Sequence, residues 1–345
     1  MARGKASRTK SATISDVATR ARVSPATVSR VFNGTSAVAA DKEARVRAAV
    51  AELDYEPFGP ARALRQQRVR VWAVIIADVE NPFFTSVVRG IEDVAYSKGY
   101  RLVLCNSDED VTKEAGYVDI AIRERMAGVV IAAASTTESQ VDRLRSEGTP
   151  VVAIDRLLKG RDVHSVTVDN RSGARQATSH LLDGGWRRVG CVVGPTRIST
   201  SNERLEGYRQ ALADAGQRYD RSLVRRADFR EDGGYKATRT LLELPEPPDS
   251  LFVANNLMTL GALHAIQDLG LRIPRDIGVV GFDDSPAADL MRPRLTVVAQ
   301  PTYEIGRVAG ELLVAATEGG ALHDVVLAPN LIIRESSRRG PAAPR

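Results

Sequence analysis

The stretch TISDVATRARVSPATVSRVFN, residues 13–33, predicts two short helices joined by a tight turn. Thr13 and Asp16 have the spacing of a capping box, in which each side chain satisfies a backbone N–H at the other position. The first helical pattern then ends, and Ser24 and Pro25 start a second one, since serine caps helices and proline fits their first position. Two helices joined in this way form a helix-turn-helix.

The second helix is the one expected to meet a partner. Its inner stripe is apolar and consists of Val28, Val31 and Phe32. Its outer positions are small, polar or cationic, namely Pro25, Ala26, Thr27, Ser29, Arg30 and Asn33. Such a face can enter the major groove of DNA. A third apolar stripe closes a three-helix core and consists of Val46, Ala49, Val50 and Leu53. Because similar helix pairs also occur in proteins that do not bind DNA, the pattern alone leaves that alternative open.

Basic residues are unevenly distributed along the chain. Residues 1–70 contain fourteen Lys and Arg against six Asp and Glu, a formal charge of +8, whereas the whole chain carries +5. A basic segment on a mildly acidic remainder is typical of a protein that contacts a polyanion through one domain. A solvated basic arm at residues 1–12 would explain only four of these positive charges.

The segments ISDVA (14–18) and VSPATVSRVFN (23–33) resemble the DNA-binding motif of the lactose-repressor (LacI/GalR) family. The resemblance implies that Pro25 and Ala26 select the base sequence, while the polar outer residues contact base edges or phosphates. The DNA-binding residues expected in this head are Thr13, Ser24, Pro25, Ala26, Thr27, Ser29, Arg30 and Asn33.

Two places in the head depart from the family pattern. Arg22 stands where a turn glycine is usual, and a left-handed backbone there would be less favourable for arginine than for glycine. Ala39 and Ala40 replace the polar cap that commonly precedes the third helix. We therefore expect the start of that helix to lack a side-chain cap.

The stretch EPFGPARAL, residues 56–64, predicts a joint because its prolines and glycine interrupt regular structure. It is similar to the hinge of the family, which folds into a short helix on specific DNA, pairs with its mate in a dimer and inserts a leucine into the minor groove. The resemblance gives this DNA-binding role to Ala61, Arg62 and Leu64. A plain interdomain linker remains the alternative, since a Gly-Pro pair lies where the family more often has good helix formers.

From residue 69 onward, apolar strand-like runs alternate with amphipathic helical segments, which is the pattern of parallel sheets covered by helices. The runs are too many for one such sheet, so two lobes are expected. The expected fold class is therefore a small all-α three-helix head (helix-turn-helix) plus an α/β two-lobe domain with parallel sheets, like a periplasmic binding protein.

The chain is expected to contain five consecutive parts. They are a basic disordered arm (1–12), a helix-turn-helix domain (13–57), a hinge (58–68), an effector-binding and dimerisation domain (69–338) and a tail (339–345). The family chain crosses between its lobes near the C-terminus. The first lobe is thus expected at about 69–168 and 299–328, and the second at about 169–298 and 329–338.

Polar residues follow many of the predicted strands, and ligands of parallel sheets bind at these carboxyl ends. For Asp78, Asp169 and Asp284 we favour a simpler role as caps of the following helices.

The resemblance assigns effector binding to Phe83, Phe84, Asp155, Arg204, Phe229, Asn255, Asp283 and Gln300. A guanidinium and carboxylates suit vicinal hydroxyls, and an aromatic face covers apolar CH groups, so the set suits a sugar. Asn256, in place of the usual aspartate, and Arg156, a second cation, leave the ligand identity open.

Composition and motifs exclude several classes of protein. The chain has 43% hydrophobic residues, but no apolar run is long enough to span a bilayer, so no membrane partner is expected. Its first residues do not resemble a secretory leader, so we expect a cytoplasmic protein. Cys105 and Cys191 lie in separate apolar runs and are expected to be reduced core residues. The four histidines are isolated, so neither a metal nor another cofactor is expected.

An enzyme is not expected, because there is no nucleophile elbow, P-loop or dinucleotide motif, and the side chains of the adjacent residues Asp283 and Asp284 would point to opposite sides of the strand end.

The sequence therefore predicts a regulator that binds double-stranded operator DNA, most simply a repressor released by a small-molecule effector such as a sugar. A homodimer on a pseudopalindromic site is expected, because one short recognition helix reads few bases. Assembly is expected to stop there, since residues 335–345 lack leucine heptads. Two alternatives remain, a co-repressed regulator that responds to a nucleoside or phosphorylated metabolite, and a sugar-binding module that does not regulate DNA.

Overall fold

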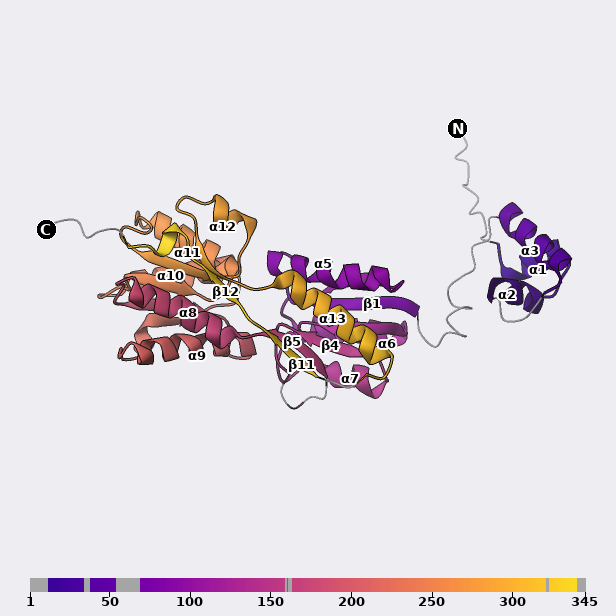
Figure 1. Cartoon of the computed structure of the whole chain (residues 1–345), viewed down its shortest axis with the longest axis horizontal. Coiled ribbons are helices and arrows are strands. Elements are labelled where there is room, and N and C mark those ends of the chain that lie inside the picture. Colours follow the sequence, from indigo (N-terminus) through magenta and orange to yellow (C-terminus); the bar gives the residue numbers. More distant parts are fainter. Residues whose placement is uncertain are drawn as a thin grey trace, which may run out of the picture. The chain divides into compact units, whose positions relative to one another are not determined.

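The computed structural model describes residues 12–33, 38–53, 69–158, 160, 163–320 and 323–339, except for the side chains of residues 32 and 33. The chain divides into two compact units, the head up to Val69 and the remainder from Arg70 (Figure 1). The predicted hinge residues Ala61, Arg62 and Leu64 lie outside the described residues.

The head consists of the three predicted helices, α1 (Ile14–Ala21), α2 (Pro25–Asn33) and α3 (Ala40–Glu52). The capping box is confirmed, because the Thr13 side chain accepts from Asp16 N while the Asp16 carboxylate accepts from Thr13 N at 2.8 Å. The turn between α1 and α2 is made by Arg22 in the left-handed region, with φ 55°, so arginine occupies a conformation that glycine tolerates better.

The second and third helices also follow the predicted pattern. Ser24 caps α2, because its hydroxyl accepts a hydrogen bond from Thr27 N at 3.2 Å. The start of α3 at Ala39 has no side-chain cap, as expected. The small core of the head is closed by the buried side chains of Val17, Ala18, Ala21, Val28, Val46 and Ala49.

The second unit contains two six-stranded sheets, each the centre of one lobe. The order of the first sheet is β11 (Asp324–Leu327), β5 (His164–Val168), β4 (Val151–Ile154), β3 (Met126–Ile131), β1 (Val69–Ile76) and β2 (Arg101–Asn106). The helices of this first lobe are α5 (Pro82–Ser97), α6 (Val111–Arg123), α7 (Val141–Ser146) and α13 (Thr302–Thr317). This arrangement confirms the predicted α/β architecture.

The second lobe repeats this plan. The order of its sheet is β12 (Asn330–Ile332), β10 (Thr296–Ala299), β9 (Gly278–Phe282), β8 (Ser250–Val253), β6 (Val189–Val193) and β7 (Val224–Arg226). Its helices are α8 (Asn170–Asp183), α9 (Ser199–Asp214), α10 (Glu231–Leu242), α11 (Asn256–Asp268) and α12 (Pro286–Leu290). Helices α8 and α9 pack against each other, as do α10 and α11.

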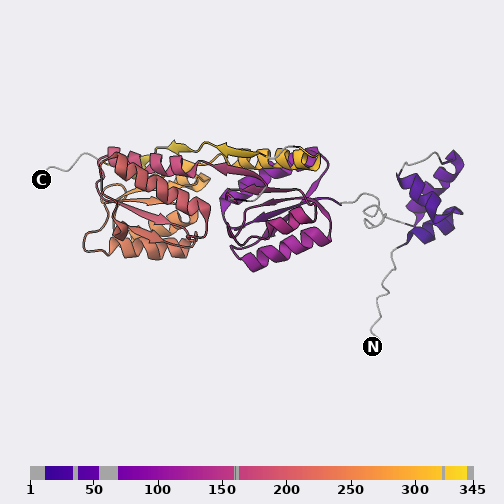
Figure 2. The same cartoon turned by 90° about the horizontal axis from the view of Figure 1, so that it is seen from below.

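The chain crosses between the lobes three times, from β5 to α8, from β10 to α13 and from β11 to β12. The last crossing runs along one side of both lobes (Figure 2). Ala299, which the sequence placed in the first lobe, instead pairs with Asn330 in the second sheet, because it is the last residue of β10.

Each lobe has its own apolar core, with Trp72 buried in the first and Trp186 in the second. Cys105 and Cys191 are buried and unpaired, as predicted. Helices α5 and α13 approach closely at Gly90, where an added Cβ would lie 2.2 Å from the Tyr303 carbonyl oxygen. Within the described part of the chain, no helix is long and apolar enough to cross a membrane.

Candidate functional site: a cavity between the lobes

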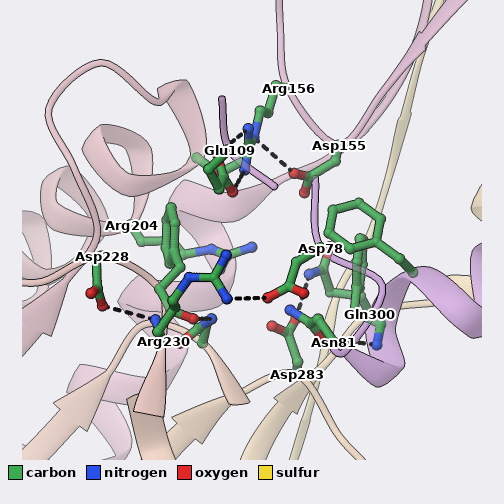
Figure 3. Close-up of a pocket in the computed structure, with 15 residues that line it drawn as sticks. Asp78, Asn81, Glu109, Asp155, Arg156, Arg204, Asp228, Arg230, Asp283 and Gln300 are labelled. Atoms are coloured by element: carbon green, nitrogen blue, oxygen red, sulfur yellow. Dashed lines mark hydrogen bonds and ion pairs between the residues drawn. The ribbon is translucent and has the colours of Figure 1, made fainter. Parts of the chain in front are cut away.

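A cavity lies between the two lobes, at the carboxyl ends of strands from both sheets (Figure 3). The structure brings all eight residues predicted for effector binding to its wall, namely Phe83, Phe84, Asp155, Arg204, Phe229, Asn255, Asp283 and Gln300. The wall also contains Asp78, Asn81, Glu109, Arg156, Thr200, Asp228 and Arg230. Both lobes therefore contribute charged groups to one site.

Arg204 is the central cation of the cavity, and Figure 3 shows its guanidinium pointing inward from α9. Nε donates to Asn170 Oδ1 at 2.9 Å and Nη1 donates to the Ala254 carbonyl at 2.6 Å. The guanidinium also lies over the Phe282 ring, 3.7 Å from its centroid. These three contacts fix the orientation of a side chain that is only 3% exposed.

Asp155 follows β4 in the left-handed region, with φ 65°, which turns its carboxylate into the cavity. Its Oδ2 lies 3.3 Å from Arg156 Nε, and Arg156 in turn holds Glu109 through both terminal nitrogens. Burial raises the pKa of Asp155 to about 6, because the attraction of Arg156 and Arg204 offsets only part of the lost hydration.

Asp283 follows β9 and also has a left-handed backbone, with φ 72°. Gln300 Nε2 donates to Asp283 Oδ1 at 2.5 Å. Burial raises the pKa of Asp283, and the nearby Arg204 guanidinium opposes that shift. Two buried carboxylates with unfavourable ionisation therefore flank one arginine, an arrangement typical of binding sites rather than of a protein core.

The apolar walls come from aromatic rings. Phe83 and Phe84 lie in the first turn of α5 and pack edge to face, with ring centroids 5.0 Å apart. Phe229 has φ 67°, and its ring lies so close to Gly194 that a Cβ there would be 2.2 Å from Cζ. Asn255 supports this wall, because its Nδ2 donates to the Phe229 carbonyl at 2.9 Å.

In the head, the residues predicted to contact DNA differ in their exposure and in their structural role. Pro25, Ala26 and Arg30 are exposed on α2, whereas Thr27 and Ser29 are half-buried. Thr13 and Ser24 use their side chains as helix caps at the surface. The side chain of Asn33 lies outside the described part of the chain.

Sequence and structure comparisons agree on the family. The family model described as "Bacterial regulatory proteins, lacI family" matches residues 13–57, and that of the "Periplasmic binding protein-like domain" matches residues 178–337. The chain is 35% identical over 330 residues to the ribose operon repressor of Halalkalibacterium halodurans, which covers 95% of this chain and 98% of the relative. The chain belongs to the lacI family.

Solved structures of similar regulators extend this result. The complex of the transcriptional regulator CelR with cellobiose has a TM-score of 0.73 and 33% identity, over 94% of this chain and 99% of CelR. The lac repressor dimer bound to operator and the anti-inducer ONPF has a TM-score of 0.81 and 26% identity, over 95% and 99% of the two chains. This lacI-family chain is thus a DNA-binding transcriptional regulator and not an enzyme, and the predicted fold class is confirmed.

Of the three aspartates predicted to cap helices, the structure of this lacI-family regulator confirms one and corrects two. Asp169 does cap α8, since it accepts from Ser172 N at 2.9 Å. Asp284 instead forms an ion pair with Arg334 at 2.9 Å, because Ser285 occupies the cap position of α12. Asp78 caps no helix either, since Asn81 caps α5 and leaves the Asp78 carboxylate in the cavity wall. As expected, Asp283 and Asp284 point in different directions.

Sequence reasoning missed five residues of the cavity wall, namely Asn81, Glu109, Thr200, Asp228 and Arg230. Asp228 and Arg230 follow β7, a strand whose residues 225 and 226 are both arginine and which lacks an apolar run. Glu109 follows β2, an edge strand in which half of the residues are exposed. Only their position could have indicated these residues, because β2 and β7 end at the same edge of their sheets as the strands that precede the other wall residues.

Proposed function

We propose that this regulator is a homodimeric repressor that leaves its operator when a neutral sugar binds in the cavity between the lobes. The observation that carries the proposal is that the buried carboxylates of Asp155 and Asp283 line one aromatic-walled cavity together with the buried Arg204 guanidinium. Relatives whose names refer to ribose or cellobiose support a sugar.

The charges of the cavity favour a neutral ligand. The carboxylates of Glu109, Asp155 and Asp283 outnumber the buried guanidinium groups of Arg156 and Arg204, and Arg156 already contacts both Glu109 and Asp155. A ligand phosphate or carboxylate would be repelled by both aspartates in a site of low dielectric constant. Sugar hydroxyls donate to carboxylates and accept from guanidinium, so they need no additional counter-charge.

The head supplies the DNA contact of the proposal. Arg30 and the small residues Pro25 and Ala26 form the exposed face of α2, as direct readout in the major groove requires. Since DNA must be the partner, we infer that the protein acts in the cytoplasm. The lac repressor dimer on its operator supports the same arrangement for this chain.

Exposed apolar residues support a dimer. Val103 and Leu104 lie on β2, an edge strand of the first sheet, and are 43% and 46% exposed. Leu290, at the end of α12 in the second lobe, is 76% exposed. An edge strand with apolar residues is normally covered by a partner. Light scattering should therefore give a dimer, and a stable tetramer at micromolar concentration would contradict the proposal.

A ligand screen followed by operator release tests the proposed function. The operator is first selected from random duplexes, and thermal shift then compares sugars, sugar phosphates and nucleosides. Each ligand that stabilises the protein is added to the operator complex while fluorescence anisotropy is recorded. We expect a neutral sugar to release the DNA. Tight binding of a nucleoside or a phosphorylated metabolite, or a ligand that strengthens operator binding, would contradict the respective part of the proposal.

A further inference from the structure

A hydrogen bond between two asparagines joins the lobes beside the cavity. Asn256, the first residue of α11 in the second lobe, donates from Nδ2 to Oδ1 of Asn81 in the first lobe at 2.8 Å. Asn81 lines the cavity and is only 8% exposed, and Asn256 is half-buried. Because the two residues belong to different lobes, this asparagine bridge is formed only while the lobes are in contact.

Backbone N–H groups fix the direction in which both amides of the asparagine bridge point. Asn81 caps α5 and accepts from Phe83 N through the same Oδ1 at 2.9 Å. Asn256 accepts from Leu257 N through its own Oδ1 at 2.8 Å, so its Nδ2 is the atom that faces Asn81. Turning either amide over would place a nitrogen against a backbone donor. The bridge therefore needs an acceptor at position 81 and a donor at position 256.

The asparagine bridge is connected to walls of the cavity in both lobes. In the second lobe, the Asn256 backbone N–H donates to Asp283, which opposes the rise in the pKa of that buried carboxyl. In the first lobe, Asn81 caps the helix whose first turn contains the wall residues Phe83 and Phe84. A change in the distance between the two asparagines would therefore move an aromatic wall of the cavity relative to Asp283.

An aspartate at position 256, the usual residue of the family, could not form this bridge. Its carboxylate has no hydrogen to donate, so an oxygen would face the Asn81 oxygen. If the Asn81 amide turned over to become the donor, Phe83 N would be left without its acceptor in a buried segment. The new negative charge would also lie beside Asp283. The amide of Asn256 therefore favours an approach of the lobes that a carboxylate would oppose.

We propose that Asn256 is a positioning residue for effector binding, whose amide holds the two lobes together across the cavity before an effector arrives. An effector that contacts both lobes then supplies less of the free energy needed to bring them together. Its apparent affinity rises with the fraction of molecules in which the lobes already meet. The inference goes beyond the proposed sugar response, because it applies to any effector that contacts both lobes.

The bridge is one of several contacts between the lobes, so its loss should weaken their association without abolishing it. Arg230 of the second lobe also pairs with Asp108 of the first, and Leu157 N of the first lobe donates to Ser199 Oγ of the second at 3.2 Å. Removal of one neutral hydrogen bond in Asn256→Ala should increase the ratio of separated to joined lobes roughly 2- to 12-fold. Asn256→Asp should have a larger effect, because it adds repulsion to the loss of the bond.

Site-resolved hydrogen–deuterium exchange of the full-length protein without effector tests this inference. The reporter is the Leu157 N–H, which is protected by Ser199 of the other lobe and does not touch either asparagine. The internal reference is the Ala132 N–H, which donates to the Ile75 carbonyl within the first lobe at 2.8 Å. When the lobes rejoin faster than the amide exchanges, the exchange rate of the reporter follows the separated fraction.

Four variants separate the bridge from other effects. Asn256→Ala and Asn256→Asp remove the donor, and Asn81→Ser removes the acceptor but keeps a residue that caps α5. The double variant Asn81→Ser/Asn256→Ala shows whether both residues act through one bond. The matched control is Asn330→Asp, which makes the same change from amide to carboxylate at an exposed residue of β12.

We expect Leu157 N to exchange roughly 2- to 12-fold faster in Asn256→Ala and in Asn81→Ser, and faster still in Asn256→Asp. The double variant should exchange no faster than the faster single variant, and Asn330→Asp should match the wild type. An unchanged Leu157 rate in Asn256→Asp overturns the proposal. So does an equal acceleration at Ala132 N, which indicates general loss of stability, or an additive effect in the double variant. A Leu157 N–H that is unprotected in the wild type overturns it as well, since the lobes would then already be apart.

Discussion

Asp155 offers a quantitative test of how the site is built, because its ionised form is buried at an energetic cost. Its pKa is raised from 3.8 to about 6 in the folded protein. At 1.36 kcal/mol for each pKa unit, ionisation of this group costs the folded state about 3 kcal/mol relative to the unfolded chain. Asp155→Asn removes that cost, since asparagine is neutral, has the same shape and tolerates the left-handed backbone at φ 65°.

The sign of the effect depends on pH. The folded pKa lies above the unfolded value, so the proton on Asp155 contributes stability below about pH 4, and this contribution is lost as the pH rises through 6. The gain from Asp155→Asn should thus be near zero at pH 4, grow between pH 4 and 6 and reach about 3 kcal/mol at pH 7.5. For a domain of this size, that gain corresponds to a rise in Tm of roughly 5 to 10 °C.

Thermal unfolding at several pH values measures this difference. Trp72 and Trp186 are buried in different lobes, so fluorescence reports on both. Asp169→Asn is the matched control, because Asp169 is an exposed helix cap after the neighbouring strand, where asparagine caps equally well. A stability gain that is the same at pH 4 and pH 7.5, or a loss at pH 7.5, would refute the burial argument.

Three other predictions concern function. Asp283→Ala should abolish sugar binding in calorimetry while operator affinity in anisotropy is retained, because the two sites lie in different units; loss of both would contradict this. Arg30→Ala should weaken operator binding by about 1 to 3 kcal/mol, or roughly 5- to 150-fold, in the same anisotropy assay, and an unchanged affinity would remove Arg30 from the DNA contact. Sugar affinity should increase as the pH rises from 5 to 7, since Asp155 accepts hydroxyl hydrogen bonds best when ionised, and calorimetry showing the reverse trend would argue against that role.

Local patterns were sufficient to predict the head. The capping box at Thr13 and the Ser24-Pro25 start are formed by residues close in sequence, so the sequence contains all the interactions that define them. The central strands could also be predicted from the sequence, because a strand that is buried on both faces consists of a continuous run of apolar residues. The edge strand β7 lacked such a run, since its residues 225 and 226 are both arginine.

The sequence predicted the residues at the centre of the cavity but not those at its rim. Strand ends and the family resemblance indicated Arg204 and Asp283, because their positions follow from the fold of each lobe. Arg230 and Glu109 depend on how closely the lobes approach, and no local pattern encodes that distance. Asp284 was misjudged for the same reason, since its partner Arg334 lies 50 residues further along the chain.

The three crossings between the lobes affect the order in which the protein can be made. Each sheet receives one edge strand from the C-terminal end, β11 in the first lobe and β12 in the second. On the ribosome, neither lobe can complete its sheet until nearly the whole chain has emerged, whereas the three helices of the head require only residues 13–53. A premature stop codon after residue 320 would therefore remove an edge strand from both lobes at once, and the nascent head would be able to fold long before any effector could control it.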